Sequence, residues 1–330
     1  MKTAPDYWYD SSRKIPLFSR LLSGVYGFVS EKRRKYYQRN ERAVYHAPIP
    51  VIVVGNINVG GTGKTPVSIA LISHLKSQGY QPALISRGYG GKADQFPQIV
   101  KKTSQPRLVG DEPVLIAQRT SIPVIVDPNR KRGIQTILES FPDVNVVISD
   151  DGLQHYAMGR DIEIVVIDGN RRFGNKRLLP AGPLREEIKR KDFVDFCICN
   201  GSQAEIGEYQ MSLDLKFAIS LDGVQTKPLA EFVGVKVHAI AGIGNPQRFF
   251  NGLEAQGLEV ITHPFADHYP FTEKDCIFED DLPVLMTEKD AVKCNSHNLS
   301  NTWVIPAETH LPAEFYIQFD KKLQSIQKVK

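Results

Sequence analysis

The stretch NVGGTGKTP, residues 58–66, constrains the fold of this chain more than any other feature. Its G-K-T ending matches the phosphate-binding loop G-x-x-x-x-G-K-[ST], with Asn58 in place of the first glycine. An apolar, β-branched run at 50–57 predicts a buried strand before the loop, and apolar residues at helical spacing over 66–79 predict a helix after it. This order aims backbone N–H groups and a helix N-terminus at a phosphate. The sequence therefore predicts a nucleotide site.

Each part of this loop has an expected role with a nucleoside triphosphate. The glycines let the backbone approach the phosphates, Lys64 pairs with the β- and γ-phosphates, and the Thr65 hydroxyl binds Mg²⁺. Asn58 is expected to replace a glycine because asparagine tolerates positive φ angles. The alternative is a glycine-rich turn that binds nothing. The predicted nucleotide-binding residues are Asn58, Val59, Gly60, Gly61, Thr62, Gly63, Lys64 and Thr65.

Further strand-like apolar runs follow this unit and indicate the fold class. Helical or loop segments separate them, which favours a mostly parallel sheet. We therefore predict an α/β fold of the P-loop NTPase type, with helices on both faces of the sheet. The runs lie at 82–86, 123–127, 144–150, 162–168 and 195–200.

The chain of 330 residues is long enough for two domains. Residues 210–224 alternate at period two and reach an Asp-Gly turn, which predicts an extended linker. A new strand–loop–helix–strand pattern covers 235–261. We expect a second, smaller α/β domain that closes a cleft. The expected division is an N-terminal segment (1–45), a P-loop domain (46–208), a β linker (209–228) and the second domain (229–330).

Positive charge is concentrated near the N-terminus. Residues 1–50 hold ten Lys/Arg against four Asp/Glu, whereas the whole chain carries a formal charge of +4. The remaining residues are thus slightly acidic, which argues against a nucleic-acid binder. Four cysteines without C-x-x-C spacing suggest neither a zinc site nor a disulfide framework.

The N-terminal segment has the pattern of an amphipathic helix. Apolar residues recur every three or four positions within 14–42, and a basic, tyrosine-bearing cluster covers 32–37. This pattern is typical of a helix that lies in a bilayer interface beside anionic headgroups. The alternative is a helix packed on the protein itself. No apolar run of 18 or more residues predicts a conventional spanning helix.

Acidic residues adjoin two of the predicted elements. Asp150 and Asp151 end an apolar strand, where a P-loop protein needs a carboxylate for Mg²⁺; a capped turn is the alternative. Asp111 and Glu112 precede an apolar helix, and spacing alone leaves Asp111 equally a helix N-cap or a base that accepts a hydroxyl proton. His268, in the string HPFADHYPF, is either part of a base-tuning cluster or structural.

Seven strings occur along the chain in the order GNINVGGTGKTP, SRGYGG, VGDEP, DDGLQH, LLPAGPLRE, FADH and LMTEKDAVKC. Together they resemble the tetraacyldisaccharide 4′-kinase family, the lipid A disaccharide kinases of Gram-negative bacteria. The resemblance covers most of the chain after about residue 45. It implies MgATP-dependent phosphorylation of the 4′-hydroxyl of an acylated glucosamine disaccharide 1-phosphate, giving lipid IVA. It also implies two α/β/α domains joined by a short β linker around the catalytic cleft.

The resemblance also implies residue roles. Asp111 would be the base, assisted by His268, with Lys64 on the phosphates. Thr65, Asp150 and Asp151 would bind Mg²⁺. Gln154 and His155 would lie close to the nucleotide. Arg87, Arg130 and Arg185 would either contact phosphate or sugar groups or serve as structural cations. One departure from the family pattern is Tyr269 after FADH, where many members carry His or Gln.

The implied setting is the cytoplasmic face of the bacterial inner membrane, with peripheral association. The N-terminal segment would meet the acyl chains of the lipid substrate, and we expect a monomer. The alternative function is a P-loop switch ATPase or GTPase that acts on a protein partner. Two details argue against it: Val59 replaces the lysine that several such loops carry, and the string TEKD (287–290) displaces the lysine of a guanine-reading T-K-x-D motif by one position.

Overall fold

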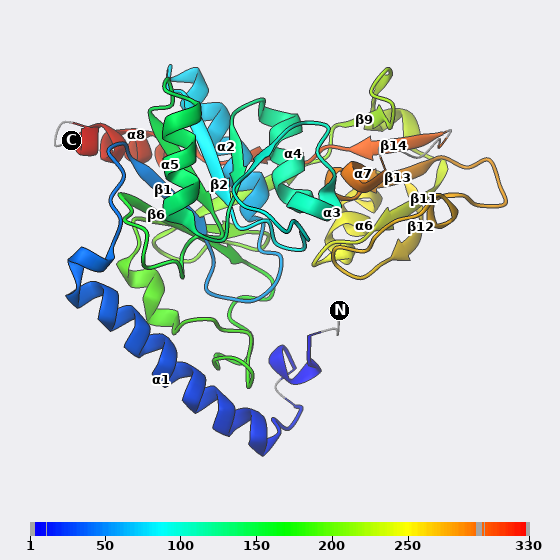
Figure 1. The fold of residues 1–330 in the computed structure, drawn as a ribbon. Helices are drawn as coiled ribbons and strands as arrows, with labels where there is room; N and C mark the ends of the chain where they lie inside the picture. Colours follow the sequence, from blue (N-terminus) through cyan, green and yellow to red (C-terminus); the bar gives the residue numbers. More distant parts are fainter. Residues whose placement is uncertain (1–3, 11, 295–298, 300, 328–330) are drawn as a thin grey trace.

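The computed structural model describes residues 4–10, 12–294, 299 and 301–327. Parts of the expected N-terminal segment and second domain lie outside these residues. The described chain forms two β-sheets with their helices, while the first long helix lies apart from both sheets (Figure 1). We call the nine-stranded sheet and its helices the first unit, and the six-stranded sheet with two helices the second unit.

The sheet of the first unit has the order β15-β8-β7-β6-β1-β5-β2-β4-β3. Neighbouring strands are parallel except for β3 with β4 and β15 with β8. The α/β fold and the parallel sheet are therefore as predicted. The strands are β1 (Val51–Gly55), β2 (Pro82–Ser86), β3 (Gln98–Val100), β4 (Val124–Val126), β5 (Val146–Asp150), β6 (Ile162–Asp168), β7 (Phe196–Asn200), β8 (Glu208–Asp214) and β15 (Glu308–His310).

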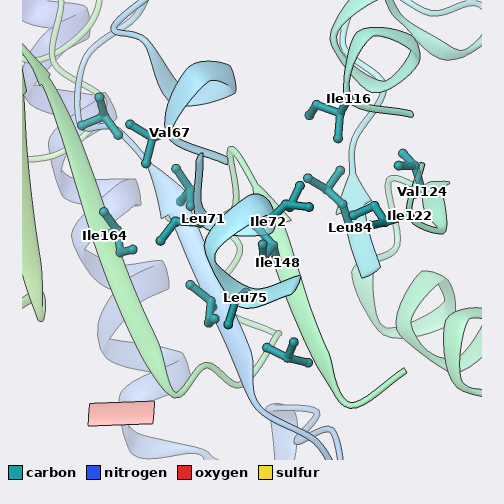
Figure 2. Packing of buried hydrophobic residues seen from close by; sticks show 14 of the residues in the cluster. Val67, Leu71, Ile72, Leu75, Leu84, Ile116, Ile122, Val124, Ile148 and Ile164 are labelled. Atoms are coloured by element: carbon teal, nitrogen blue, oxygen red, sulfur yellow. The ribbon is translucent and has the colours of Figure 1, made fainter. Parts of the chain in front are cut away.

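Helices cover both faces of this sheet, which explains its continuous apolar strands. Alternate residues of β1 face opposite sides: Ile52 packs in the core with α2, α4 and α8, whereas Val53 packs in the core with α5. Figure 2 shows Leu71 and Leu75 of α2 beside Ile148 and Ile164 of the sheet. The helices of this unit are α2 (Lys64–Ser77), α3 (Pro106–Val109), α4 (Asp111–Thr120), α5 (Arg130–Ser140) and α8 (Ala313–Gln327).

The second unit has a six-stranded sheet in the order β10-β9-β14-β13-β11-β12. Strands β12, β11, β13 and β14 are parallel, and β9 joins them antiparallel beside β14. The strands are β9 (Phe217–Ser220), β10 (Thr226–Pro228), β11 (Lys236–Ala241), β12 (Glu259–Pro264), β13 (Val284–Thr287) and β14 (Thr302–Ile305), and the helices are α6 (Pro246–Glu254) and α7 (Glu288–Cys294). Short 3₁₀ helices lie at Asp6–Trp8, Glu41–Ala43, Ile188–Phe193, Leu229–Phe232 and Glu273–Cys276.

The chain crosses between the units twice. In the expected linker, β8 extends the first sheet and the β9–β10 hairpin begins the second. After β14 the chain returns, because β15 pairs with β8 and α8 packs on the first sheet through Phe315 and Phe319. His74 of α2 also meets Asp320 of α8 at 2.8 Å. Strand β15 and helix α8 therefore pack with the first unit, whereas we expected 229–330 to form one domain.

Helix α1 (Leu17–Arg39) touches the first unit along one narrow face. The Ser23 hydroxyl donates to the carbonyl of Leu178 (2.9 Å), and the Tyr26 hydroxyl donates to the carbonyl of Arg185 (3.1 Å). Its apolar stripe lies away from these contacts and is 57–72% exposed: Leu17, Phe18, Leu21, Val25, Phe28 and Val29. Among the described residues, no helix combines the length and apolar character needed to cross a bilayer.

Candidate active site

The predicted P-loop joins β1 to α2, at the point where the sheet order places β1 between β5 and β6. Gly63 precedes the helix with φ 99°, and a Cβ there would lie 2.3 Å from the Asn200 amide nitrogen. Only glycine fits both the backbone angle and the space. The Asn200 amide also donates to the Thr62 carbonyl (3.0 Å), so the end of β7 supports the loop. The loop therefore has the rigid glycine-rich form that phosphate binding requires.

The expected reason for Asn58 is wrong. Asn58 is absent from the described non-glycine residues with positive φ. Its side-chain amide instead donates to the carbonyl of Arg172 (2.6 Å), and its backbone forms an isolated bridge with Leu184. Asn58 thus ties the start of the loop to the segment after β6, a role that glycine has no side chain to fill.

Asp150 and Asp151 lie at the carboxyl end of β5, beside the P-loop lysine. The Lys64 ammonium is 3.6 Å from Asp151 Oδ1, and Arg185 Nη1 lies 2.9 Å from the same oxygen. Burial would raise the pKa of Asp151, but Lys64 and Arg185 outweigh it and hold the pKa at about 2. Asp151 is therefore a fixed negative charge.

Asp150 has a different environment. It is buried, and its Oδ1 has no hydrogen-bond partner among the described residues. Burial, reinforced by the charge of Glu112, raises its pKa to about 7 although Lys64 opposes the shift. A buried carboxylate oxygen without a partner is costly. A cation at this position would relieve that cost, so the donor set suits a hard metal ion.

Asp111 and His268 come together across the boundary between the units. His268 Nδ1 lies 2.9 Å from Asp111 Oδ2 and 3.0 Å from Oδ1. Gly110, not Asp111, occupies the cap position of α4, and Asp111 Oδ1 also accepts from the next backbone N–H, that of Glu112 (3.0 Å). Burial would raise the pKa of Asp111, but the hydrogen bond from His268 and the charge of Lys289 lower it overall. The geometry favours a hydrogen-bonded Asp–His pair over a helix cap.

His268 is held in an uncommon backbone conformation. Its φ is 60°, its amide donates to the carbonyl of Gly242 (3.2 Å), and the Tyr89 ring lies 5.3 Å from the imidazole. A left-handed conformation at a non-glycine residue persists only where the surroundings hold it. Such residues often occur at functional sites.

A cavity of about 580 Å³ lies between the two units. Both units contribute to its lining, so a nucleotide held by the P-loop would also face the second unit. The lining includes Thr62, Lys64 and Glu112 on one side and Gly244, Arg248 and Lys289 on the other.

Gln154 and His155 lie near Asp151 and away from this cavity lining. The Gln154 amide donates to the Asn56 carbonyl (3.0 Å) and to Glu186 Oε1 (2.8 Å). Burial, together with the positive charge of Arg130, lowers the pKa of His155 to about 4. His155 is therefore a neutral imidazole at physiological pH.

The three arginines have different environments. Arg130 is 2% exposed and donates to the carbonyls of Asp127 and Asp150, so it acts as an internal cation under the aspartates. Burial lowers its pKa to about 10. Arg185 is held against Asp151, and Arg87 is exposed.

Several residues at the cleft received no role from the sequence. Lys289 of α7 lies 2.9 Å from Glu112 Oε1 and 3.3 Å from Asp267 Oδ1, although the TEKD string suggested only a poor match to a guanine motif. Asp168, at the end of β6, binds Arg171 (2.9 Å) of its own unit and Arg248 (3.2 Å) of α6. A spatial pairing across the two units was the missing information.

Comparisons with known proteins agree with this geometry. A family model described as tetraacyldisaccharide-1-P 4′-kinase matches residues 16–324. The tetraacyldisaccharide 4′-kinase of Nitrosococcus oceani is 47% identical over 324 residues, covering 98% of this chain and 95% of that protein. Its counterpart in Stenotrophomonas maltophilia is 45% identical, covering 98% of this chain and 97% of its own.

A solved structure has the same overall fold. It is the "apo" form of LpxK from Aquifex aeolicus in complex with ATP, with a TM-score of 0.77 and 27% identity, covering 92% of this chain and 97% of that one. The family match spans both units and includes the P-loop, the paired aspartates and the Asp111–His268 pair. This chain therefore belongs to the tetraacyldisaccharide 4′-kinase family.

Proposed function

We propose that this chain transfers the γ-phosphate of ATP to the 4′-hydroxyl of a tetraacylated glucosamine disaccharide 1-phosphate, forming lipid IVA in lipid A biosynthesis. The observation that carries the proposal is the Asp111–His268 pair, joined at 2.9 Å beside the cavity that the P-loop lines. A switch protein that only hydrolyses nucleotide has no need of a base for a sugar hydroxyl. Family membership supports the same acceptor.

Asp111 acts as the base in this proposal. A sugar hydroxyl is a weak acid, so it needs a positioned proton acceptor in the transition state. The lowered pKa keeps Asp111 ionised, and His268 orients the carboxylate. Lys64 and the backbone N–H groups of the P-loop stabilise the charge on the transferring phosphoryl group. Gln154 and His155 would lie near the nucleotide on the Asp151 side, outside the residues that line the cavity.

Thr65, Asp150 and Asp151 would hold Mg²⁺ with the nucleotide. The unpartnered Oδ1 of Asp150 supports this assignment, and carboxylates combined with substrate phosphates are the usual ligands of Mg²⁺ in kinases. When bound, Mg²⁺ would neutralise part of the phosphate charge. Arg130 stabilises the carboxyl end of β5 by donating a hydrogen bond to the Asp150 carbonyl.

Helix α1 would bind the membrane surface where the lipid substrate resides. Its exposed apolar stripe suits the bilayer interface, and Arg33, Arg34 and Lys35 follow on the same helix to meet anionic headgroups. We propose peripheral association with the cytoplasmic face of the inner membrane.

The exposed Arg87 and the partly exposed Arg185 remain the candidates for the polar head of the substrate. One chain supplies both members of the Asp111–His268 pair, which supports a monomer.

Transfer of labelled γ-phosphate from ATP to purified disaccharide 1-phosphate in detergent micelles tests the function. We expect label in the lipid with wild type, and a loss of roughly 10²–10⁴-fold with Asp111→Asn. The melting temperature of that variant should stay near the wild-type value, because Gly110 occupies the cap position. Release of labelled inorganic phosphate without labelled lipid would favour the switch protein instead.

A further inference from the structure

We propose that Lys289 is a positioning residue that holds the Asp111–His268 pair together across the cleft. This inference rests on the proposed roles of Asp111 and His268. It assigns a purpose to the TEKD string, to which the proposed function gives no role.

Lys289 contacts the chain neighbours of both members of the pair. Its ammonium lies 2.9 Å from Glu112, which follows Asp111, and 3.3 Å from Asp267, which precedes His268. The other carboxylate oxygen of Asp267 lies 3.7 Å from His268 Nε2. These contacts form a closed ring through both units, and Lys289 is the cation that joins its two halves.

Lys289 and His268 share an anchor within the second unit. Asp290, the next residue of α7, is fully buried and accepts a hydrogen bond from the Gly242 amide (3.0 Å). The carbonyl of the same Gly242 accepts from the amide of His268 (3.2 Å). The start of α7 and the His268 loop are therefore fixed to one backbone position, so the bond from Lys289 to Glu112 also sets the distance from His268 to Asp111.

The charge balance of the ring depends on this lysine. Burial would lower the pKa of Lys289, but the carboxylates of Glu112, Asp111 and Asp267 raise it overall, so the side chain is cationic. Without it, Glu112 and Asp267 would lack the cation between them. Like charges at short range in a partly buried site repel each other. The α4 helix and the His268 loop would then separate, and a displacement of about 1 Å is enough to cost on the order of 10²-fold in rate.

A direct contact with phosphate is the competing role, since Lys289 lines the same cavity as the P-loop. The two roles differ in which kinetic constant they change. A phosphate ligand contributes to nucleotide affinity, whereas a residue that only positions the base contributes to the rate of transfer at saturating ATP.

The test compares Lys289→Met with Arg119→Met. Arg119, near the end of α4, pairs with Glu288 of α7 at 2.6 Å, so this control removes an ion pair between the same two helices outside the ring. We expect Lys289→Met to lower kcat by roughly 10–100-fold, with the affinity for fluorescently labelled ATP within about twofold of wild type. Lys289→Arg should recover part of the rate, and Arg119→Met should stay within about threefold of wild type.

A double-mutant cycle separates positioning from independent effects. In a His268→Ala background, Lys289→Met should cost less than about threefold further, because the pair it positions is already broken. Multiplicative losses would overturn the proposal, as would equal losses in Arg119→Met or a loss of labelled-ATP affinity at unchanged kcat. Should Lys289→Met fail to fold, Glu112→Ala removes the 2.9 Å contact of the same lysine and must show the same non-additivity. Full activity of His268→Ala would refute the proposed role of the Asp111–His268 pair itself.

Discussion

The membrane role of α1 can be tested by two substitutions on its exposed stripe. Leu21 and Val25 are 65% and 61% exposed, whereas Leu22 is 40% exposed and lies nearer the protein. Burying the exposed part of each side chain in the interface should contribute about 1–2 kcal/mol. A carboxylate there would also repel anionic headgroups, at a cost of about 1 kcal/mol each. Leu21→Glu with Val25→Glu should therefore weaken binding by about 4 kcal/mol or more, close to a thousandfold.

Flotation with anionic liposomes measures this change directly. Val224→Glu with Ile277→Glu adds the same charge at residues that are 79% and 61% exposed on the second unit, so it controls for net charge. We expect the α1 variant to leave the liposome fraction and to show a raised apparent KM for the lipid substrate, with ATP affinity unchanged. The control should float like wild type. Equal flotation of both variants, insensitive to salt, would refute the assignment of this stripe to the bilayer.

Three further predictions concern the phosphate site. Lys64→Ala should lower kcat/KM in the transfer assay by about a hundredfold or more, since one electrostatic contact to a transferring phosphoryl group is often worth about 3 kcal/mol; near-normal turnover would contradict the P-loop assignment. Asn58→Gly should lower the free energy of unfolding by about 1 kcal/mol in chemical denaturation, because it removes the bond to Arg172 and adds backbone freedom. His155, with a folded pKa of about 4 against an ordinary 6.5, binds fewer protons than the unfolded chain in that range, so stability should rise with pH from 4 to 6.5. Thermal unfolding at pH 5 and 7.5 should show a smaller pH effect in His155→Gln than in wild type, and an equal effect would contradict the shift.

The local sequence pattern was sufficient to predict the core strands of the first unit. A strand buried on both faces consists of β-branched and apolar residues, so β2 and β6 could be placed from the sequence alone, at Pro82–Ser86 and Ile162–Asp168. The P-loop was equally local, since the strand, glycines and helix are contiguous. The conformation of Asn58 could not be predicted from local sequence, because its side chain binds a carbonyl 114 positions away.

The pairs that complete the site join residues far apart in the chain. Asp111 and His268 are separated by 157 positions, and spacing alone left Asp111 undecided between a cap and a base. Only the family resemblance linked the two. The resemblance covers Lys289 in the string LMTEKDAVKC but gave it no role, and its partners belong to α4 and to the loop after β12. The placement of α8 was similarly hidden, since an amphipathic helix can cover either unit and its choice depends on the apolar surface left open by β7 and β8.

Short contacts connect α1 to the P-loop lysine. The Tyr26 hydroxyl of α1 binds the carbonyl of Arg185, the side chain of Arg185 binds Asp151, and Asp151 lies 3.6 Å from Lys64. The charge of Arg33, farther along α1, also reaches His155 and helps to lower the pKa of that imidazole. A lipid whose acyl chains stay in the bilayer presents its sugar at a fixed height above the surface. By bonding to the segment that positions Asp151, α1 would set the height of the bound phosphates as well. Under the proposed membrane role, one helix would therefore place the acceptor hydroxyl and the P-loop at matching heights above the bilayer.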